Sequence, residues 1–303
     1  MTAGRQARFG FVALIGRPNV GKSTLLNRLV QTKLAIVSDK PQTTRNRIAG
    51  VRNYPGGQVV FLDTPGIHRP THRMNVRMVD AAVEGMRQAD VVALVSDATD
   101  GRAGRGERFI LDQVHASSVP VVLVINKIDL VPRPSLLPLI DSWRTRRPFA
   151  DIVPVSARSG ENVDRLEHVL LGLLPEAEPL YPTEYLTDQP ERFFVAETVR
   201  EKVLESTHAE IPFSTAVAVD RFEEADESGV MRLYCSIIVE RESQKPILIG
   251  RGGEMIKRIG TAARKDLETF FDTKVFLDLR VKVRAEWRED ERLLDELGLR
   301  GRE

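Results

Sequence analysis

Residues 16–23 constrain the fold of this chain more than any other stretch. They read Gly-Arg-Pro-Asn-Val-Gly-Lys-Ser and match the pattern G-x-x-x-x-G-K-[ST]. The apolar run Phe9–Ile15 precedes them, and the amphipathic segment Thr24–Leu29 follows. This order predicts a strand, a glycine-rich loop and a helix whose N-terminal amides face a phosphate group.

Four further apolar runs alternate with amphipathic segments in the first half of the chain. They are Val59–Leu62, Val91–Val95, Val119–Ile125 and Ile152–Val155. Such runs are typical of buried strands in a mostly parallel sheet with right-handed crossovers. Residues 54–57 predict a hairpin turn after an edge strand near 50–53. We therefore predict an α/β P-loop domain over residues 1–176, with a mostly parallel sheet and helices on both faces.

A different pattern begins after an acidic, proline-interrupted stretch at residues 177–190, which we interpret as a linker. The following order of helical and strand-like segments is α-β-β-α-α-β. It runs over residues 191–208, 214–222, 231–240, 246–249, 254–271 and 274–283. This order predicts a smaller α+β domain over residues 191–303, distinct from the first domain.

Composition excludes several classes of protein. Cys235 is the one cysteine, so an intramolecular disulfide framework is excluded and a reducing compartment is favoured. Its apolar neighbours predict a buried strand position. No run approaches the ~18–20 apolar residues that span a bilayer, and the N-terminal apolar segment leads into the loop motif rather than a cleavage site. We expect a monomeric cytoplasmic protein, and leave open a peripheral association with the inner face of the cell membrane.

Three more motifs each follow a predicted strand, where open α/β sheets bind ligands. Residues 63–66 read Asp-Thr-Pro-Gly, residues 126–129 read Asn-Lys-Ile-Asp, and residues 156–158 read Ser-Ala-Arg. The Asp129 carboxylate can accept hydrogen bonds from the N1–H and the 2-amino group of guanine, a pair that adenine lacks. Together with residues 16–23, these motifs predict a GTP site.

From the chemistry of phosphate and metal binding we predict a role for each polar residue of these motifs. Lys22 would neutralise the β- and γ-phosphate oxygens, and Ser23 would ligate Mg²⁺. Asp63 would lie near the metal. A threonine of the Pro-Gln-Thr-Thr-Arg segment, Thr44 in preference to Thr43, would complete the metal shell and sense the γ-phosphate.

The remaining motif residues hold the base and the loops. The Gly66 amide would lie by the γ-phosphate, Asn126 would tie its loop to residues 16–23, and the Lys127 stem would pack along the base. A backbone amide of the Ser-Ala-Arg motif would reach guanine O6. We assign catalysis to Lys22, Thr44 and Gly66. The predicted GTP-binding residues are Gly16, Arg17, Pro18, Asn19, Val20, Gly21, Lys22, Ser23, Thr24, Asp63, Thr64, Pro65, Gly66, Asn126, Lys127, Asp129, Ser156, Ala157 and Arg158.

The motifs GRPNVGKST, KPQTTRNRI, DTPGIH, NKIDL and SAR resemble those of the Era family of bacterial GTPases, within the TrmE-Era-EngA-like group. The block RESQKPILIGRGGEMIKRIG resembles the type II KH domain of that family, so the resemblance covers nearly the whole chain. It implies a GTPase that uses Mg²⁺, binds 16S ribosomal RNA near its 3′ end, and acts in maturation of the 30S ribosomal subunit.

The position after Gly66 departs from GTPases that orient the attacking water with a glutamine, because it holds Ile67. The resemblance to the Era-like subclass implies slow hydrolysis until a partner or an ion completes the site. Asn19 matches the asparagine that helps hold K⁺ in related potassium-activated GTPases. A loop residue retained for its turn-forming tendency is the alternative. His68 and His72 invite assignment as a general base, although a mobile loop role is the simpler interpretation.

Residues 250–253, Gly-Arg-Gly-Gly, match the G-x-x-G loop with which KH domains clamp about four nucleotides of single-stranded RNA. Residues 181–303 carry a net charge of −6, yet residues 241–265 hold seven basic and two acidic residues. This predicts a locally basic groove. The predicted RNA-binding residues are Lys245, Ile247, Ile249, Gly250, Arg251, Gly252, Gly253, Lys257 and Arg258.

Several alternatives stay open at this point. Ile247 and Ile249 could contact bases or belong to the core. The acidic tail at residues 287–299 could contact RNA or the first domain. A pure RNA-binding module with a vestigial nucleotide fold is the competing function, but it would not need Lys22, Asp63 and Asp129 together. A membrane-linked signalling GTPase is a third candidate, without a transmembrane run or a terminal lipidation cysteine in this sequence.

Overall fold

The computed structural model describes residues 7–40, 42–68, 70–101, 105–115, 118–225, 227 and 229–299. The chain divides into two compact units. Unit 1 comprises Met1–Ala35, Gln42–Pro70 and Asn75–Asp188, and unit 2 comprises Ile36–Pro41, Thr71–Met74 and Gln189–Glu303. No helix in the described ranges is both long enough and apolar enough to span a membrane.

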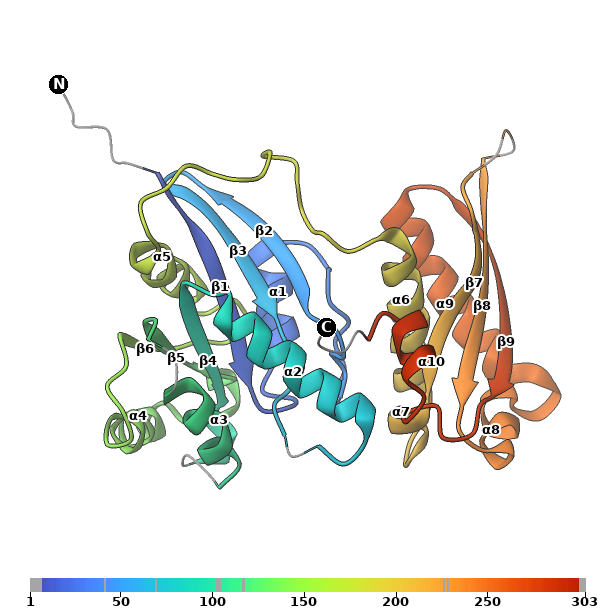
Figure 1. Ribbon diagram of the computed structural model, residues 1–303, viewed down its shortest axis with the longest axis horizontal. Coiled ribbons are helices and arrows are strands. Elements are labelled where there is room, and N and C mark those ends of the chain that lie inside the picture. Colours follow the sequence, from blue (N-terminus) through green and yellow to red (C-terminus); the bar gives the residue numbers. More distant parts are fainter. Residues whose placement is uncertain are drawn as a thin grey trace. The chain divides into compact units, whose positions relative to one another are not determined.

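Unit 1 is built on a six-stranded sheet with the order β2-β3-β1-β4-β5-β6 (Figure 1). The strands are β1 Arg8–Gly16, β2 Ile48–Tyr54, β3 Gly57–Asp63, β4 Val91–Asp97, β5 Val121–Asn126 and β6 Asp151–Pro154. Every neighbouring pair is parallel except β2 and β3, which form an antiparallel hairpin at the edge. Every residue of β4 and of β5 is buried, as expected for central strands covered on both faces.

Helices cover both faces of this sheet (Figure 1). They are α1 Lys22–Val30, α2 Arg73–Arg87, α3 Arg105–His115, α4 Leu136–Arg144 and α5 Val163–Leu173. One apolar core joins inward residues of β1, β4 and β5 to α2, α3 and α4, and includes the fully buried Trp143. Helices α1 and α5 contact the sheet from the other side. This arrangement confirms the predicted α/β P-loop fold.

Residues of the predicted linker pack against the edge of the unit 1 sheet. The side chain of Gln58 donates to the Tyr181 carbonyl at 2.8 Å and accepts from its amide at 3.0 Å. The Tyr181 and Tyr185 rings stack with centroids 4.7 Å apart. The Val51 amide donates to the Leu186 carbonyl at 2.8 Å. The Val51 bond occupies a backbone group of the edge strand β2 that would otherwise be exposed for pairing.

Unit 2 follows the predicted α-β-β-α-α-β order around a three-stranded sheet, β7-β8-β9. Its elements are α6 Glu191–Ser206, α7 Ile211–Ser214, β7 Ala216–Glu223, β8 Val230–Val239, α8 Lys245–Ile249, α9 Glu254–Phe271, β9 Lys274–Val283 and α10 Glu291–Glu296. Strands β7 and β8 are antiparallel, whereas β8 and β9 are parallel. One short helix, α7, was not expected from the sequence. Cys235 is buried in the core of this unit, as predicted, and burial raises the pKa of its thiol to about 12.

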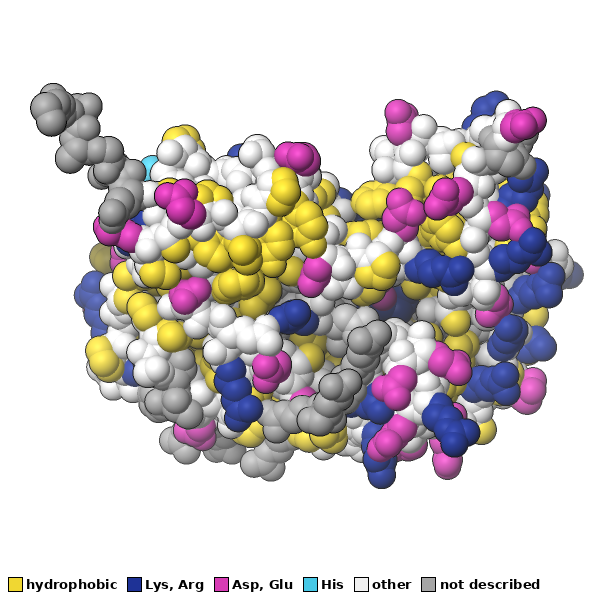
Figure 2. Space-filling view, turned by 45° about the horizontal axis from the view of Figure 1, so that its top comes forward, with side chains coloured by type: hydrophobic (Ala, Val, Ile, Leu, Met, Phe, Trp, Pro, Cys, Tyr) yellow, Lys and Arg dark blue, Asp and Glu magenta, His cyan; other side chains and the backbone are white. Residues whose placement is uncertain are grey.

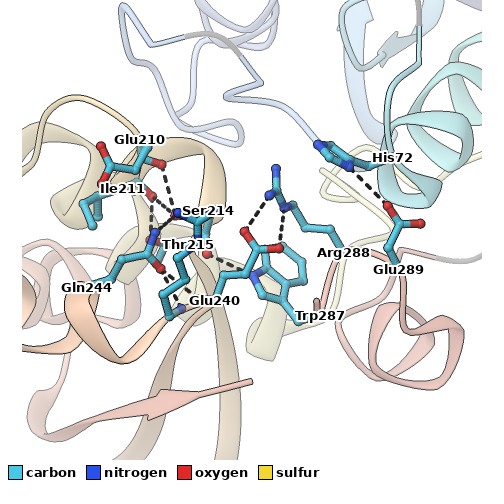
Figure 3. A network of polar contacts seen from close by, with 11 residues as sticks. His72, Glu210, Ile211, Ser214, Thr215, Glu240, Gln244, Trp287, Arg288 and Glu289 are labelled. Atoms are coloured by element: carbon cyan, nitrogen blue, oxygen red, sulfur yellow. Dashed lines mark hydrogen bonds and ion pairs between the residues drawn. The ribbon is translucent and has the colours of Figure 1, made fainter. Parts of the chain in front are cut away.

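The segment after β9 is anchored in unit 2 by the contacts drawn in Figure 3. Trp287 is fully buried, and its indole N–H donates to the Ser214 carbonyl at 2.9 Å. The Gln244 amide donates to the Ser214 hydroxyl at 3.0 Å. Arg288 pairs with Glu240 at 2.5 Å. The start of the acidic tail is therefore part of the hydrogen-bonded framework of unit 2.

Candidate functional site

A buried lysine, Lys22, is the first residue of α1, directly after the loop that follows β1. Lys22 Nζ donates to the carbonyls of Gly16, at 3.2 Å, and of Arg17, at 2.9 Å. Burial lowers the pKa of Lys22 to about 8, while the nearby Asp63 carboxylate acts in the opposite direction. A charged ammonium held mainly by carbonyl groups would gain strongly from anionic phosphate oxygens. The loop therefore supplies the cation that phosphate binding needs.

Three predicted metal-shell residues converge beside this lysine. Ser23 Oγ lies 2.6 Å from Thr44 Oγ1 and donates to Asp63 Oδ2 at 2.7 Å. Thr44 Oγ1 lies 3.3 Å from the same carboxylate oxygen. The other oxygen, Asp63 Oδ1, is buried with no hydrogen-bond partner, and burial raises the pKa of this carboxyl. A divalent cation fits this group of oxygens, because it would satisfy the orphaned oxygen and favour the charged carboxylate.

The Asp-Thr-Pro-Gly turn packs directly against the phosphate loop. A Cβ at Gly66 would lie 2.6 Å from the Pro18 nitrogen, so no side chain fits there. The Ile67 amide donates to the Gly16 carbonyl at 3.1 Å. The Ile67 side chain is buried in the unit 1 core. It therefore points away from any position from which it could contact an attacking water.

Each histidine of this region has one ring nitrogen in contact with the protein. His68 Nδ1 lies 2.9 Å from the Gly66 carbonyl. His72, in a segment that belongs to unit 2, pairs with Glu289 at 3.1 Å (Figure 3). These contacts occupy one nitrogen of each ring, and His68 Nε2 is buried with no hydrogen-bond partner.

The Asn-Lys-Ile-Asp motif ties the loops of the site together. Asn126 donates to the Val20 carbonyl at 2.8 Å and accepts from the Ala157 amide at 2.9 Å. Lys127 Nζ donates to the Asn19 carbonyl at 2.8 Å and pairs with Asp97 at 2.5 Å. Asn126 thus links both neighbouring loops to its own, whereas the sequence analysis expected only the link to residues 16–23.

Asp97, which the sequence analysis missed, orients Lys127. Burial would raise the pKa of Asp97, but hydrogen bonds from Lys127 and Thr99 outweigh burial and lower it. The carboxylate therefore stays charged beside the lysine. Its position at the carboxyl end of β4 was the available signal, because the carboxyl ends of the parallel strands meet at this edge. Asp129 is exposed, so its carboxylate is accessible to a base.

The other predicted residues of this site lie in the same group of loops. Thr43, our second choice for the metal shell, is buried next to Thr44. The Thr64 hydroxyl donates to the Leu14 carbonyl at 2.8 Å, so its role in this structure is to fix the turn. Ser156 is fully buried, and its hydroxyl accepts from the Ser159 amide at 3.1 Å. Pro41 lies outside the described residues.

In unit 2, the Gly-Arg-Gly-Gly loop joins α8 to α9 through a backbone that only glycine adopts readily. Gly250 has φ 76°, and a Cβ there would lie 2.7 Å from the Met255 nitrogen. Gly252 and Gly253 also have positive φ, at 60° and 83°. The backbone of these glycines lies at the N-terminus of the 18-residue helix α9, where a phosphate group binds favourably.

A groove of about 1050 Å³ runs between α9 and β9. Its lining residues are Val230, Ile256, Lys257, Gly260, Thr261, Arg264, Glu268, Asp272, Thr273, Lys274, Val275, Phe276, Leu277 and Leu279. Lys257 is the one residue of the predicted RNA site among them. The i, i+4, i+8 spacing of Ile256, Gly260 and Arg264 was the signal that could have extended the prediction along the helix.

The predicted RNA residues outside the groove flank its loop end. Ile247 is 48% exposed, so the alternative that it belongs to the core is wrong, whereas its neighbour Leu248 is fully buried. Ile249 is half-buried, and Arg251 and Arg258 are exposed. Figure 2 shows Lys and Arg side chains distributed over unit 2, on the right, with acidic side chains between them.

Comparisons with known proteins match both units. The family described as 50S ribosome-binding GTPase matches residues 11–127, and the KH domain family matches residues 210–288. A protein called GTPase Era from Geotalea uraniireducens is 51% identical over 97% of this chain and 98% of its own length. The GTPase Era of Geobacter metallireducens is 50% identical over 96% and 97%.

Two solved structures resemble the whole chain. A variant of Era from Aquifex aeolicus bound to GDP and AlF4⁻ has a TM-score of 0.93 and 42% identity, and the match covers 96% of this chain and 99% of that one. Era in complex with MgGDPNP and nucleotides 1506–1542 of 16S ribosomal RNA has a TM-score of 0.93 and 41% identity, with coverage of 97% and 99%.

Proposed function

Because the chain belongs to the Era family of GTPases, we propose that unit 1 binds and hydrolyses GTP and that unit 2 binds single-stranded RNA. The observation that carries the first half is the convergence of Ser23, Thr44 and Asp63 oxygens beside the buried Lys22. Such a group of oxygens and one ammonium suits a metal ion bound to a polyphosphate.

In this proposal each residue performs a task that its contacts support. Ser23, Thr44 and Asp63 would hold Mg²⁺, which when bound neutralises charge on the phosphate oxygens. Lys22 would exchange its carbonyl contacts for phosphate oxygens. The Gly66 amide would face the γ-phosphate, in a turn that already packs against the phosphate loop.

The absence of a catalytic glutamine supports a slow reaction. Ile67 is 2% exposed, so hydrolysis would rely on electrostatic stabilisation of the phosphates rather than on a side chain that orients water. We propose K⁺ beside Asn19 as the added positive charge. Hydrolysis should then be faster in K⁺ than in Na⁺ at equal ionic strength, and Asn19→Ala should abolish the difference. Equal rates in both salts would exclude the K⁺ site but would not contradict GTP hydrolysis by this chain.

The RNA target in this proposal is the 3′ end of 16S ribosomal RNA, and the role is maturation of the 30S subunit. Support comes from the Era complex that contains nucleotides 1506–1542 of that RNA. Filter binding with this fragment and with a scrambled sequence of equal length tests the target. Equal affinity for both would contradict it. The proposed location is cytoplasmic, and cell fractionation tests it together with the peripheral membrane association that the sequence left open. Light scattering tests the proposed monomeric state.

The competing function is an RNA-binding module whose nucleotide fold is vestigial. Single-turnover GTP hydrolysis, measured with and without the RNA fragment, separates the two candidates. The proposed GTPase hydrolyses bound GTP, and Lys22→Ala abolishes this reaction. A wild-type protein that neither binds nor hydrolyses GTP would favour the vestigial alternative.

A further inference from the structure

Arg28 connects helix α1 to the loop that follows β6. It lies in the last turn of α1. Its Nε donates to the Ala157 carbonyl at 3.2 Å, and its Nη2 donates to the Arg158 carbonyl at 2.6 Å. These partners lie 129 and 130 residues further along the chain. The Arg28 guanidinium group therefore donates hydrogen bonds to two successive carbonyls of the Ser-Ala-Arg motif.

The bond from Arg28 Nε to the Ala157 carbonyl fixes the orientation of one peptide group. The N–H of the same peptide group is a hydrogen-bond donor. The Ala157 carbonyl and the Arg158 N–H belong to the same peptide, and in a planar trans peptide they point in opposite directions. A guanidinium that holds the carbonyl therefore sets the direction of the Arg158 N–H. The preceding amide, that of Ala157, already donates to Asn126. The next N–H along the loop is that of Arg158.

We propose that Arg28 is a positioning residue for guanine recognition, because it holds the Ala157–Arg158 peptide so that the Arg158 N–H meets guanine O6. This inference rests on the proposed GTP site. It adds to that site the side chain that keeps the O6 donor of the Ser-Ala-Arg motif in place. Asp129 reads the N1–H and 2-amino edge, so the two readers act on different atoms of the base.

Arginine suits this position for two physical reasons. A cation in the last turn of a helix is favoured by the partial negative charge of the helix C-terminus. The planar guanidinium also presents several N–H groups in a fixed arrangement, so that two carbonyls are held at once. A lysine could reach the same carbonyls, but its single flexible ammonium would fix the peptide less well.

The test compares three nucleotides in competition binding to the full chain. GTP carries every base contact, 6-thio-GTP replaces O6 by a sulfur that accepts hydrogen bonds weakly, and ITP lacks the 2-amino group. Arg28→Ala should weaken binding of GTP and of ITP by about tenfold, as expected for loss of one well-placed hydrogen bond. Binding of 6-thio-GTP should hardly change. The preference for GTP over 6-thio-GTP should therefore fall towards one, while the preference for GTP over ITP stays at the wild-type value.

Two further variants make the result specific. Arg87→Ala removes an exposed arginine from the last turn of α2 and should leave both preferences unchanged. Arg28→Lys should restore part of the preference for GTP over 6-thio-GTP. A wild-type preference in Arg28→Ala would overturn the proposal. Equal weakening of all three nucleotides, or loss of folding in the Arg28 variants, would assign Arg28 a purely structural role and also overturn it.

Failure of the wider proposal gives a different result. A wild-type protein that does not prefer GTP over ATP would contradict the nucleotide site itself. A wild-type protein that prefers GTP over ATP but binds 6-thio-GTP as tightly as GTP would leave the GTP site intact and exclude the O6 donor.

Discussion

At the scale of single residues, the exposed carboxylate of Asp129 is the simplest determinant to test. Asp129→Asn turns an acceptor into a group that also donates, so it should lose preference for guanine and gain affinity for xanthine, which presents acceptors at those positions. The expected loss in GTP affinity is about a hundredfold or more, by analogy with sites that leave a buried polar group unpaired. Competition between GTP and XTP measures the change.

The matched control is Asp141→Asn, on α4, which alters an equally charged and highly exposed residue of the same unit. It should keep the wild-type ratio of GTP to XTP affinity. If Asp129→Asn also keeps that ratio, Asp129 is not the reader of the guanine edge.

The pKa of Lys22 predicts how binding and stability depend on pH. Its folded value of about 8 lies below the 10.5 of an exposed lysine, so between these values the unfolded chain binds more protons. Stability of the nucleotide-free protein should therefore gain a contribution from Lys22 as pH rises across this interval. Phosphate binding has the opposite effect, because it favours the charged ammonium. GTP affinity should fall as pH rises above about 8.

Calorimetry detects the proton that Lys22 takes up when GTP binds. At about pH 8.5, the apparent enthalpy of GTP binding should vary with the ionisation enthalpy of the buffer, in the direction of proton uptake. Lys22→Arg keeps a permanent charge and should show less uptake. Equal uptake in both proteins would show that the proton enters another group.

At the scale of elements, sequence patterns located helices and strands well but could not locate surfaces formed by distant segments. Helix α9 and strand β9 have the predicted bounds, because their apolar periodicity is strong and glycine and turn residues flank them. The sequence predicted a basic groove at residues 241–265 but not the part that β9 lines, since that part depends on how the helix packs over the strand. Arg28 was missed for the same reason, because its partners lie far away in the sequence.

We expect the Gly-Arg-Gly-Gly loop between α8 and α9 to contribute most of the RNA affinity of unit 2. Arg251→Asp with Gly252→Asp places negative charge where phosphate would lie and forces a side chain onto a backbone with φ 60°. RNA affinity should fall by tenfold or more, and each lost phosphate contact should reduce the salt slope by about 0.7. Filter binding across a salt series measures both quantities.

The control for this loop is Arg221→Asp, which introduces negative charge at an exposed position of β7, outside the predicted RNA-binding residues. Its RNA affinity should stay near that of the wild type. Unchanged affinity in the Arg251 and Gly252 double variant would indicate that the loop is only a turn between helices.

At the scale of the whole molecule, the two proposed sites lie in different units, so their ligands should be separable by mutation. The Arg251→Asp and Gly252→Asp double variant should bind GTP with wild-type affinity. Asp129→Asn should bind RNA normally when nucleotide is absent. A fluorescent nucleotide titration beside RNA filter binding tests both statements. A parallel loss of both ligands in either variant would show that the substitution unfolds more than its site.

The two tryptophans of the chain make each unit optically distinguishable. Trp143 lies in the core of unit 1 and Trp287 belongs to unit 2, and both are fully buried, so their emission should shift to the red when each unit unfolds. Trp143 Nε1 has no hydrogen-bond partner, whereas Trp287 donates to Ser214, so Trp143→Phe removes a chromophore without breaking a hydrogen bond. With GDP and Mg²⁺ at about a hundred times the dissociation constant, the denaturation midpoint seen by Trp143 in Trp287→Phe should rise by the equivalent of about 2.7 kcal/mol. The midpoint seen by Trp287 in Trp143→Phe should rise only to the extent that unfolding of one unit drives unfolding of the other.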